Sequence, residues 1–214
     1  MALHMRVNPA APEERAMVLA AEVLQAGGVI VYPTETLYGL GANAWNADAI
    51  RKIHLLKRRT ENKPILVIVP SEETVRGLAV DITPAARSLM HAFWPGPLTL
   101  VFAAAQEVSP ELTQGRGTIG IRVPSSPLCR ALSTLCGYPI TSTSANLSGK
   151  PIPQSVAGIE SALGPGVDLY LDAGPLPASH PSTVIDVSAR RPRLLRAGAI
   201  PTDRITAIVP DLFQ

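Results

Sequence analysis

Short apolar runs alternate with amphipathic stretches along the whole chain. Residues 12–25 repeat apolar positions at helical spacing, start at Pro12 and stop before Gly27 and Gly28, which predicts an amphipathic helix. The β-branched run in "GVIVYP" follows and is ended by Pro33, which predicts a buried strand. The same alternation of helix and strand continues to the C-terminus.

Similar reasoning places the remaining elements. Asn46 is a favourable N-cap for a helix over 46–58. Interleaved helices and strands are typical of an α/β domain, so we expect an extended, mixed and twisted sheet with flanking helices. Further helices are predicted over 71–78, 83–93, 126–135, 155–163 and 202–208, and strands over 65–69 and within "WPGPLTLVF", "TIGIRVP", "YPITSTS", "VDLYLDAG", "STVIDVS" and "PRLLRAG".

Composition narrows the class of protein. With 214 residues, 46% hydrophobic and 17% charged, the chain can bury the core of one globular domain. Its longest apolar runs, "PILVIVP" and "PLTLVFAAA", fall far short of the roughly 20 residues that span a bilayer. The N-terminus lacks the pattern of an export signal, so we expect a cytoplasmic protein that binds no membrane. Cys129 and Cys136 are predicted to be reduced core thiols, and the four scattered histidines predict no cysteine or histidine metal site.

Basic residues are concentrated in two segments. Residues 51–63 hold six Lys or Arg and one acid, and residues 190–204 hold five Arg and one acid. Two basic segments on an otherwise more acidic chain favour a ligand that carries phosphate. A solvated helix face with a basic tail remains an alternative interpretation. A module that grips double-stranded RNA without catalysis is another.

The segment "KRRTENKP" contains three cations of the first basic region that are candidates for binding phosphate. Lys57, Arg59 and Lys63 lie where a predicted helix ends and the chain turns toward a strand. Three cations at one turn repel one another unless an anion lies between them, and a triphosphate would supply that anion. A solvated helix end is the competing interpretation.

Two polar segments follow predicted strands. In "PITSTSANLSGKP", Ser142, Thr143, Ser144 and Asn146 can donate to phosphate or carboxylate oxygens at a strand end, where α/β folds usually present ligands. In "VYPTETLYGLG", threonines follow a buried strand and the glycines permit close backbone approach. The "GRGTIG" segment matches GxGxxG, but it leads into a predicted strand instead of a helix, so we do not interpret it as a dinucleotide site.

Together these segments resemble a known family. "GGVIVYPTETLYGLGANA", "KRRTENKPI", "FWPGPLTLVF", "IGIRVP", "TSTSANLSGKP", "STVIDV" and "LLRAGAI" occur in the order found in the YrdC-like threonylcarbamoyl-AMP synthases, over about residues 12–200. The resemblance implies a YrdC-like fold with a concave basic ligand site. It also implies a catalytic domain over 12–201, preceded by an N-terminal extension at 1–11 and followed by a short C-terminal segment at 202–214.

The resemblance also assigns roles to residues. The family's KxR and SxN signature implies a catalytic set that faces the ATP phosphates and magnesium: Lys57, Arg59, Ser144 and Asn146. It implies threonine binding by Thr34, Thr36, Arg122, Ser142 and Ser182, with Arg122 on the carboxylate, and ATP binding by Arg59, Lys63, Thr118, Ser144 and Arg196. Many members have His at the position of Ile68, so one threonine contact is expected to be absent or replaced.

The implied activity is that of an L-threonylcarbamoyladenylate synthase, a nucleotidyltransferase. It would form threonylcarbamoyl-AMP and pyrophosphate from L-threonine, bicarbonate and ATP, with Mg²⁺ held mainly through the ATP phosphates. The product would feed the tRNA threonylcarbamoyltransferase machinery that makes t6A, with direct RNA contact a further expectation. Two alternatives stay open: a relative that acts on another carbamoyl acceptor, and a stand-alone paralogue without synthase activity.

Overall fold

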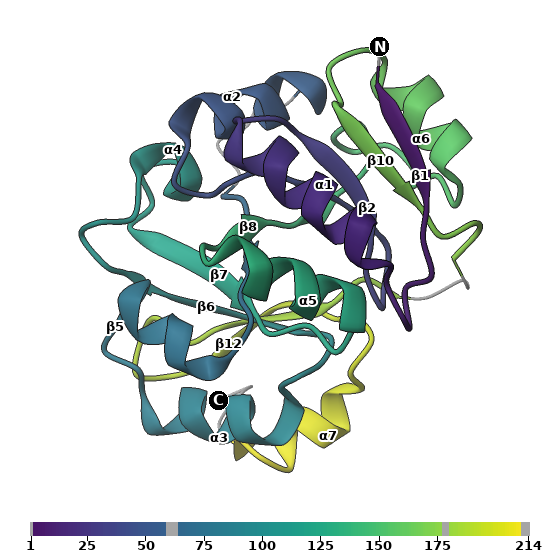
Figure 1. Ribbon diagram of the computed structural model, residues 1–214. Helices are drawn as coiled ribbons and strands as arrows, with labels where there is room; N and C mark the ends of the chain where they lie inside the picture. The colour runs from purple at the N-terminus through teal and green to yellow at the C-terminus, as the bar shows by residue number, and fades with distance from the viewer. Residues whose placement is uncertain (1, 59–63, 177–179, 211–214) are drawn as a thin grey trace.

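The strands form two mixed sheets, with helices on their outer faces (Figure 1). The computed structural model describes residues 2–58, 64–176 and 180–210. One sheet has five strands in the order β1 (Leu3–Arg6), β10 (Leu169–Asp172), β2 (Ile30–Pro33), β3 (Tyr38–Gly41) and β9 (Thr143–Ser144). The other has seven: β12 (Arg193–Arg196), β11 (Thr183–Asp186), β6 (Leu98–Ala104), β7 (Thr118–Arg122), β4 (Val67–Ile68) and β8 (Ile140–Thr141) in order, with β5 (Ala79–Val80) pairing β6.

The predicted α/β class with a mixed sheet is confirmed, but the single extended sheet is divided. β8 belongs to the seven-stranded sheet and β9 to the five-stranded sheet, and only Ser142 separates them. The backbone N–H of Ser142 donates to the carbonyl of Leu66 at 2.8 Å, between β8 and β9. The segment "TSTS" therefore passes from one sheet to the other, which brings hydroxyl side chains to the place where the sheets meet.

Each predicted helix is present. The helices are α1 (Glu14–Gln25), α2 (Ala47–Leu56), α3 (Pro84–Phe93), α4 (Pro110–Thr113), α5 (Pro127–Cys136), α6 (Val156–Leu163) and α7 (Thr202–Thr206), with a 3₁₀ helix over Glu72–Gly77. Of these, α4 is a short helix that was not predicted from the sequence. Asn46 is the predicted N-cap of α2, because its side chain accepts from the Ala49 N–H at 3.0 Å. Figure 1 shows α1 and α5 lying side by side, and α3 and α7 close together below the seven-stranded sheet.

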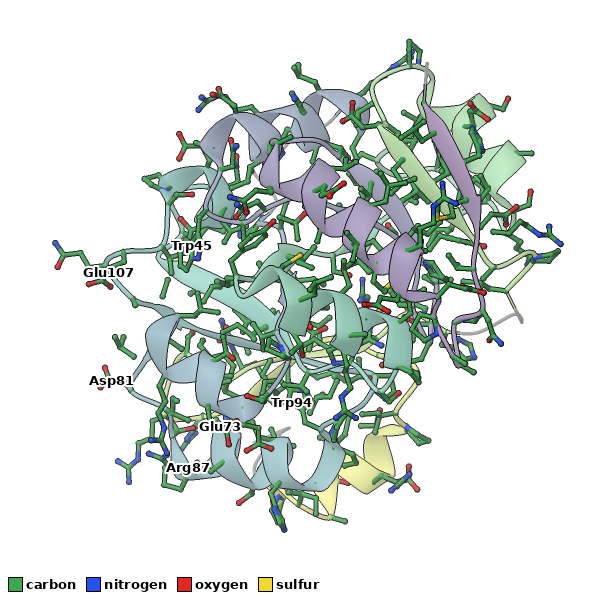
Figure 2. All side chains as sticks on the ribbon, viewed as in Figure 1. Trp45, Glu73, Asp81, Arg87, Trp94 and Glu107 are labelled. Carbon is green, nitrogen blue, oxygen red and sulfur yellow. The ribbon has the colours of Figure 1, made fainter. Side chains whose placement is uncertain are left out.

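Apolar side chains form a core on both sides of the sheets. The smaller core packs α1 and α5 against β2 and β10, with Leu24, Ile30, Leu132 and Leu169 fully buried. The larger core lies among the other helices, the seven-stranded sheet and residues of β2, β3 and β10 in the five-stranded sheet. Figure 2 shows Trp94 inside the molecule, where its Nε1–H donates to the Leu98 carbonyl at 2.7 Å and fixes the Pro-rich turn before β6.

The two thiols are free, as predicted. Cys129 is buried and Cys136 is partly buried. Burial raises the pKa of Cys129 to about 12, so this side chain is a neutral thiol in the core. Among the described helices, none is long and apolar enough to cross a membrane.

One strand lies in the segment that was interpreted as an N-terminal extension. Leu3–Arg6 forms β1 and pairs in parallel with β10, at the edge of the five-stranded sheet. Only Met5 of its four residues is half-buried and the others are exposed, so the sequence carries no alternation that would predict a strand. The proposed domain limits themselves stay a prediction.

Candidate functional site

A cavity of about 540 Å³ opens where the two sheets meet. Its walls come from the loop between β2 and β3, from β7, from the β8–β9 segment, and from β11 and β12. Most of the predicted site residues line it: Thr34, Thr36, Thr118, Arg122, Ser142, Ser144, Ser182 and Arg196. The fold therefore brings together side chains that are far apart in the sequence.

The loop after β2 is held by the side chain of Thr34. Its Oγ1 accepts from the backbone N–H groups of Thr36 and Leu37, each at 3.1 Å, and donates to the Leu37 carbonyl at 2.7 Å. A threonine hydroxyl that caps its own turn fixes the loop conformation. Thr34 thus shapes this wall of the cavity, while Thr36 presents its hydroxyl to Arg122.

Arg122, at the end of β7, is a buried cation in the cavity wall. Only 4% of the residue is exposed. Its Nε–H donates to the Gly96 carbonyl at 3.1 Å, and its Nη1 donates to Thr36 Oγ1 at 3.3 Å. Its Nη2 lies 2.7 Å from Glu35 Oε1. These contacts hold a guanidinium at the place where a substrate carboxylate could pair with it.

Glu35 is the acidic partner of that guanidinium. Burial raises the pKa of the Glu35 carboxyl, but the Arg122 guanidinium and the Ser125 N–H together lower that pKa below its ordinary value. Glu35 Oε1 accepts from the Ser125 N–H at 2.7 Å and from the Ser125 hydroxyl at 3.1 Å. The carboxylate is therefore charged, and it joins the β2–β3 loop to the loop after β7.

Arg196, in β12, provides a second cation in the cavity wall. Its Nε and Nη2 both donate to the Ser182 carbonyl, at 3.1 and 2.9 Å, and Nη2 donates to Ser182 Oγ at 3.0 Å. Burial and the positive charge of Arg122 lower the pKa of Arg196. Two guanidinium groups that repel each other across a cavity favour an anion between them.

The structure describes three residues of the KxR and SxN signature, Lys57, Ser144 and Asn146. Lys57 is buried and does not line the cavity; its Nζ donates to the carbonyls of Ser144 and Asn146, the latter at 2.8 Å. Ser144 Oγ donates to Asn146 Oδ1 at 2.6 Å and faces the cavity. Lys57 thus holds the Ser144–Asn146 turn from behind. Arg59 and Lys63 lie outside the described residues.

The two basic segments differ in what they contact. In the first, Arg51 pairs with Asp48 and with Glu111 at 3.1 Å, and Lys52 donates to the Gly27 carbonyl at 2.9 Å, all away from the cavity. In the second, Arg193 and Arg196 line the cavity. The predicted concave basic site is therefore built from β7 and β12, with the described part of the first segment lying outside its lining.

Sequence reasoning missed several residues of the site. Arg116, in the "GRGTIG" segment, lines the cavity together with Thr118. Asp186 also lines it and pairs with Arg193 at 3.0 Å. Burial raises the pKa of Asp186, but Ser188 and Arg193 lower it below its ordinary value. The segment "STVID" gives no local signal that its acid pairs with an arginine seven residues later.

Ile68 lies in the core and not in the cavity wall. It is 1% exposed and packs with Tyr32, Leu128 and Ile140. Among the described residues, no group of three or more His, Cys, Asp or Glu side chains could hold a metal ion. The side-chain oxygens of the cavity lining that could bind a metal ion belong to hydroxyl groups and to Asp186. The Asp186 carboxylate already pairs with Arg193.

The sequence of this chain is similar to those of known proteins. The model of the Sua5/YciO/YrdC family, described as "Telomere recombination", matches residues 22–198. The chain belongs to this family. A relative from Mycobacterium tuberculosis is 38% identical over 200 residues, which cover 92% of each chain. The threonylcarbamoyl-AMP synthase of Bacillus subtilis is 39% identical over 191 residues, which cover 89% of this chain and 55% of that protein.

A solved structure of a family member has a similar fold. Sua5 from Pyrococcus abyssi, crystallised as a complex with L-threonine, superposes with a TM-score of 0.91 at 33% identity. The match covers 99% of this chain and 62% of that protein, so this chain spans little more than half of the longer family members. The YrdC-like fold predicted from the motifs is confirmed.

Proposed function

We propose that this chain is a threonylcarbamoyl-AMP synthase that joins L-threonine, bicarbonate and ATP. One observation carries the proposal: the buried Arg122 guanidinium lies in a hydroxyl-lined cavity that holds a second arginine, Arg196. Such a cavity suits two anionic substrates that must meet despite their repulsion. Membership of the family and the threonine complex of a relative support the same assignment.

At the proposed threonine end, Arg122 pairs with the amino-acid carboxylate. Thr36, Ser142 and Ser182 supply hydroxyls that can bond the threonine side chain or amine. Thr34 contributes indirectly, because its own hydroxyl is engaged in the turn that presents Thr36. Ile68 supplies no contact here, since its side chain lies in the core.

At the proposed nucleotide end, Thr118, Ser144 and Arg196 face the phosphates, with Arg116 as an additional cation. Arg59 and Lys63 are assigned to the same end from the family resemblance alone. Mg²⁺ prefers to keep its waters and to bind substrate phosphates, so it would enter with ATP and neutralise charge there. The hydroxyl oxygen of Ser144 lines the cavity and would fit such an ion, whereas Asn146 Oδ1 already accepts from Ser144 and lies 3.3 Å from the Lys57 ammonium.

The chain's side chains act by position and charge. The threonine amine condenses with bicarbonate to form a carbamate with loss of water, and a carbamate oxygen then attacks the α-phosphate of ATP and expels pyrophosphate. Arg122 and Arg196 offset the repulsion among carbamate, carboxylate and phosphates. This chemistry makes the chain a nucleotidyltransferase. The remaining parts of the proposal are a cytoplasmic location, direct contact with RNA, and delivery of the product to the tRNA threonylcarbamoyltransferase machinery that makes t6A.

Pyrophosphate release tests the proposal. The protein is incubated with ATP, Mg²⁺ and bicarbonate, and with each amino acid in turn. Release that depends on threonine supports the synthase. Tight, salt-sensitive binding of double-stranded RNA without any release would instead support the RNA-binding alternative. Release that depends on a different carbamoyl acceptor would support the relative with another substrate.

A further inference from the structure

Glu35 contacts Arg122 of the cavity wall without lining the cavity itself. Its carboxylate lies 2.7 Å from Arg122 Nη2 and accepts from the Ser125 N–H, also at 2.7 Å. Its side chain is 17% exposed. This acid therefore links the loop before β3 to the chain after β7, with the guanidinium between them.

Three groups hold the Arg122 guanidinium in one orientation. Gly96 accepts from Nε, Thr36 accepts from Nη1, and Glu35 pairs with Nη2. A guanidinium has five N–H donors in a fixed fork, so Nη1 keeps a second N–H beyond its bond to Thr36, whereas Nη2 is buried beside Glu35. Of the three partners, only Glu35 carries a charge that compensates the buried cation.

We propose that Glu35 is a positioning residue that orients Arg122 for the carboxylate of threonine. The inference rests on the proposed function, because it assigns Arg122 to that carboxylate. A buried cation without its counter-charge is costly and tends to move toward water. Loss of the carboxylate would therefore cost threonine binding without touching either substrate directly.

The charge state of Glu35 agrees with this role. The Arg122 guanidinium and the Ser125 N–H lower the pKa of the carboxyl against the effect of burial, so it is ionised wherever the enzyme would work. The contact spans the β2–β3 loop and β7, which have no ladder pairing with each other. Glu35 thus fixes the relative position of Thr36 and Arg122, the two groups at the proposed threonine end.

Glu35→Gln is the direct test. The amide keeps the shape and an acceptor for Ser125, but it removes the charge opposite Arg122. We expect the KM for threonine to rise about tenfold or more, the size typical when an outer partner of a binding group is lost. The KM for ATP should stay within about twofold. Glu111→Gln is the matched control, since it removes an acid paired with Arg51 outside the cavity and should change neither constant.

A double-mutant cycle separates positioning from general damage. If Glu35 acts through Arg122, adding Glu35→Gln to Arg122→Lys should change the threonine KM by less than about twofold. A full tenfold effect in the Arg122→Lys background, or equal rises in the KM of both substrates, would overturn the inference. If Glu35→Gln does not fold, Glu35→Asp keeps the charge and should show a smaller rise, measured by calorimetric titration with threonine; unchanged binding there would also count against the role.

Different results would contradict the proposed function and the proposed role of Glu35. Wild-type protein that releases no pyrophosphate with threonine contradicts the synthase assignment. Wild-type protein that does so, together with a Glu35→Gln variant of unchanged threonine KM, contradicts only the role of Glu35.

Discussion

Lys57 is buried although it carries a charge, and its ammonium group lies among carbonyl oxygens. It contacts Ser144 O and Asn146 O and lies 3.3 Å from Asn146 Oδ1. The resemblance assigned this lysine to the ATP phosphates. In the structure, Lys57 stabilises the turn that presents Ser144 to the cavity.

Lys57→Met should therefore affect both folding and activity. Removal of the ammonium takes a donor from the Asn146 carbonyl, while the Ser144 carbonyl keeps the Asn146 N–H, so we expect the free energy of unfolding to fall by about 2 kcal/mol, and pyrophosphate release to fall with it. Lys52→Met is the control, because Lys52 also donates to a carbonyl, that of Gly27, but is exposed. Urea denaturation that gives equal stabilities for Lys57→Met and wild type would contradict this account.

Glu35 links stability to pH. Its pKa is lowered on folding from an ordinary value of 4.5, so ionised Glu35 stabilises the fold above that pH and loses this contribution as the pH falls below it. At pH 7, Glu35→Gln should unfold about 2 kcal/mol more easily than wild type. The difference should shrink as the pH falls below about 4.5. Urea denaturation across this range checks it, and a difference that stays constant would show that charge is not the cause.

At the scale of elements, β12 must approach the start of β11 closely for Arg196 to reach Ser182. Gly198, just after β12, allows this approach. A Cβ at this position would lie 2.3 Å from the Pro181 carbonyl oxygen and 2.6 Å from the Ser182 carbonyl carbon and oxygen. Backbone atoms cannot move aside as a flexible side chain could, so any side chain here would push β12 away from the cavity wall.

Gly198→Ala should reduce kcat/KM by about tenfold or more, because a displacement of about 1 Å in a site is costly. Gly77→Ala is the matched control: a Cβ there has no heavy atom within 4 Å, and its φ is not positive. Steady-state kinetics of both variants decide the point. Equal activity of Gly198→Ala and wild type would show that the close approach does not position Arg196.

Most elements could be predicted, because local signals define them. The Asn46 cap of α2 and the prolines that begin α3 and α5 agree with the structure. β1 and β3 could not, since neither shows a clear period. The division into two sheets also escaped prediction, because the break at Ser142 depends on which strands β8 and β9 pair with.

The site was predicted by residue type and by family resemblance, not by contacts. Arg122 and Thr36 are 86 positions apart, and no local pattern pairs them. The same holds for the Glu35 and Arg122 ion pair and for the carbonyl partners of Lys57. Such contacts depend on the assembled sheets, so the sequence could name candidates without showing which of them face the cavity.

At the scale of the whole molecule, the cavity should select its amino acid by a hydroxyl. Thr36, Ser142 and Ser182 line the proposed threonine end, and a threonine hydroxyl can add a hydrogen bond to theirs that a valine side chain cannot make. Sites built around a substrate hydroxyl reject the analogue without it by roughly 10⁴ in favourable cases, whereas one methyl group is worth about 10- to 200-fold. We expect kcat/KM to rank threonine above serine and serine above valine. Valine above serine would show that the pocket is apolar.

The fate of bicarbonate carbon tests the central claim most directly. The protein is incubated with ¹³C-bicarbonate, ATP, Mg²⁺ and threonine, and the nucleotide product is analysed by mass spectrometry together with released pyrophosphate. The account predicts an adenylate that carries both threonine and the labelled carbon, formed one for one with pyrophosphate and absent when threonine is left out. An unlabelled threonyl adenylate, or no threonine-dependent pyrophosphate at all, would contradict it.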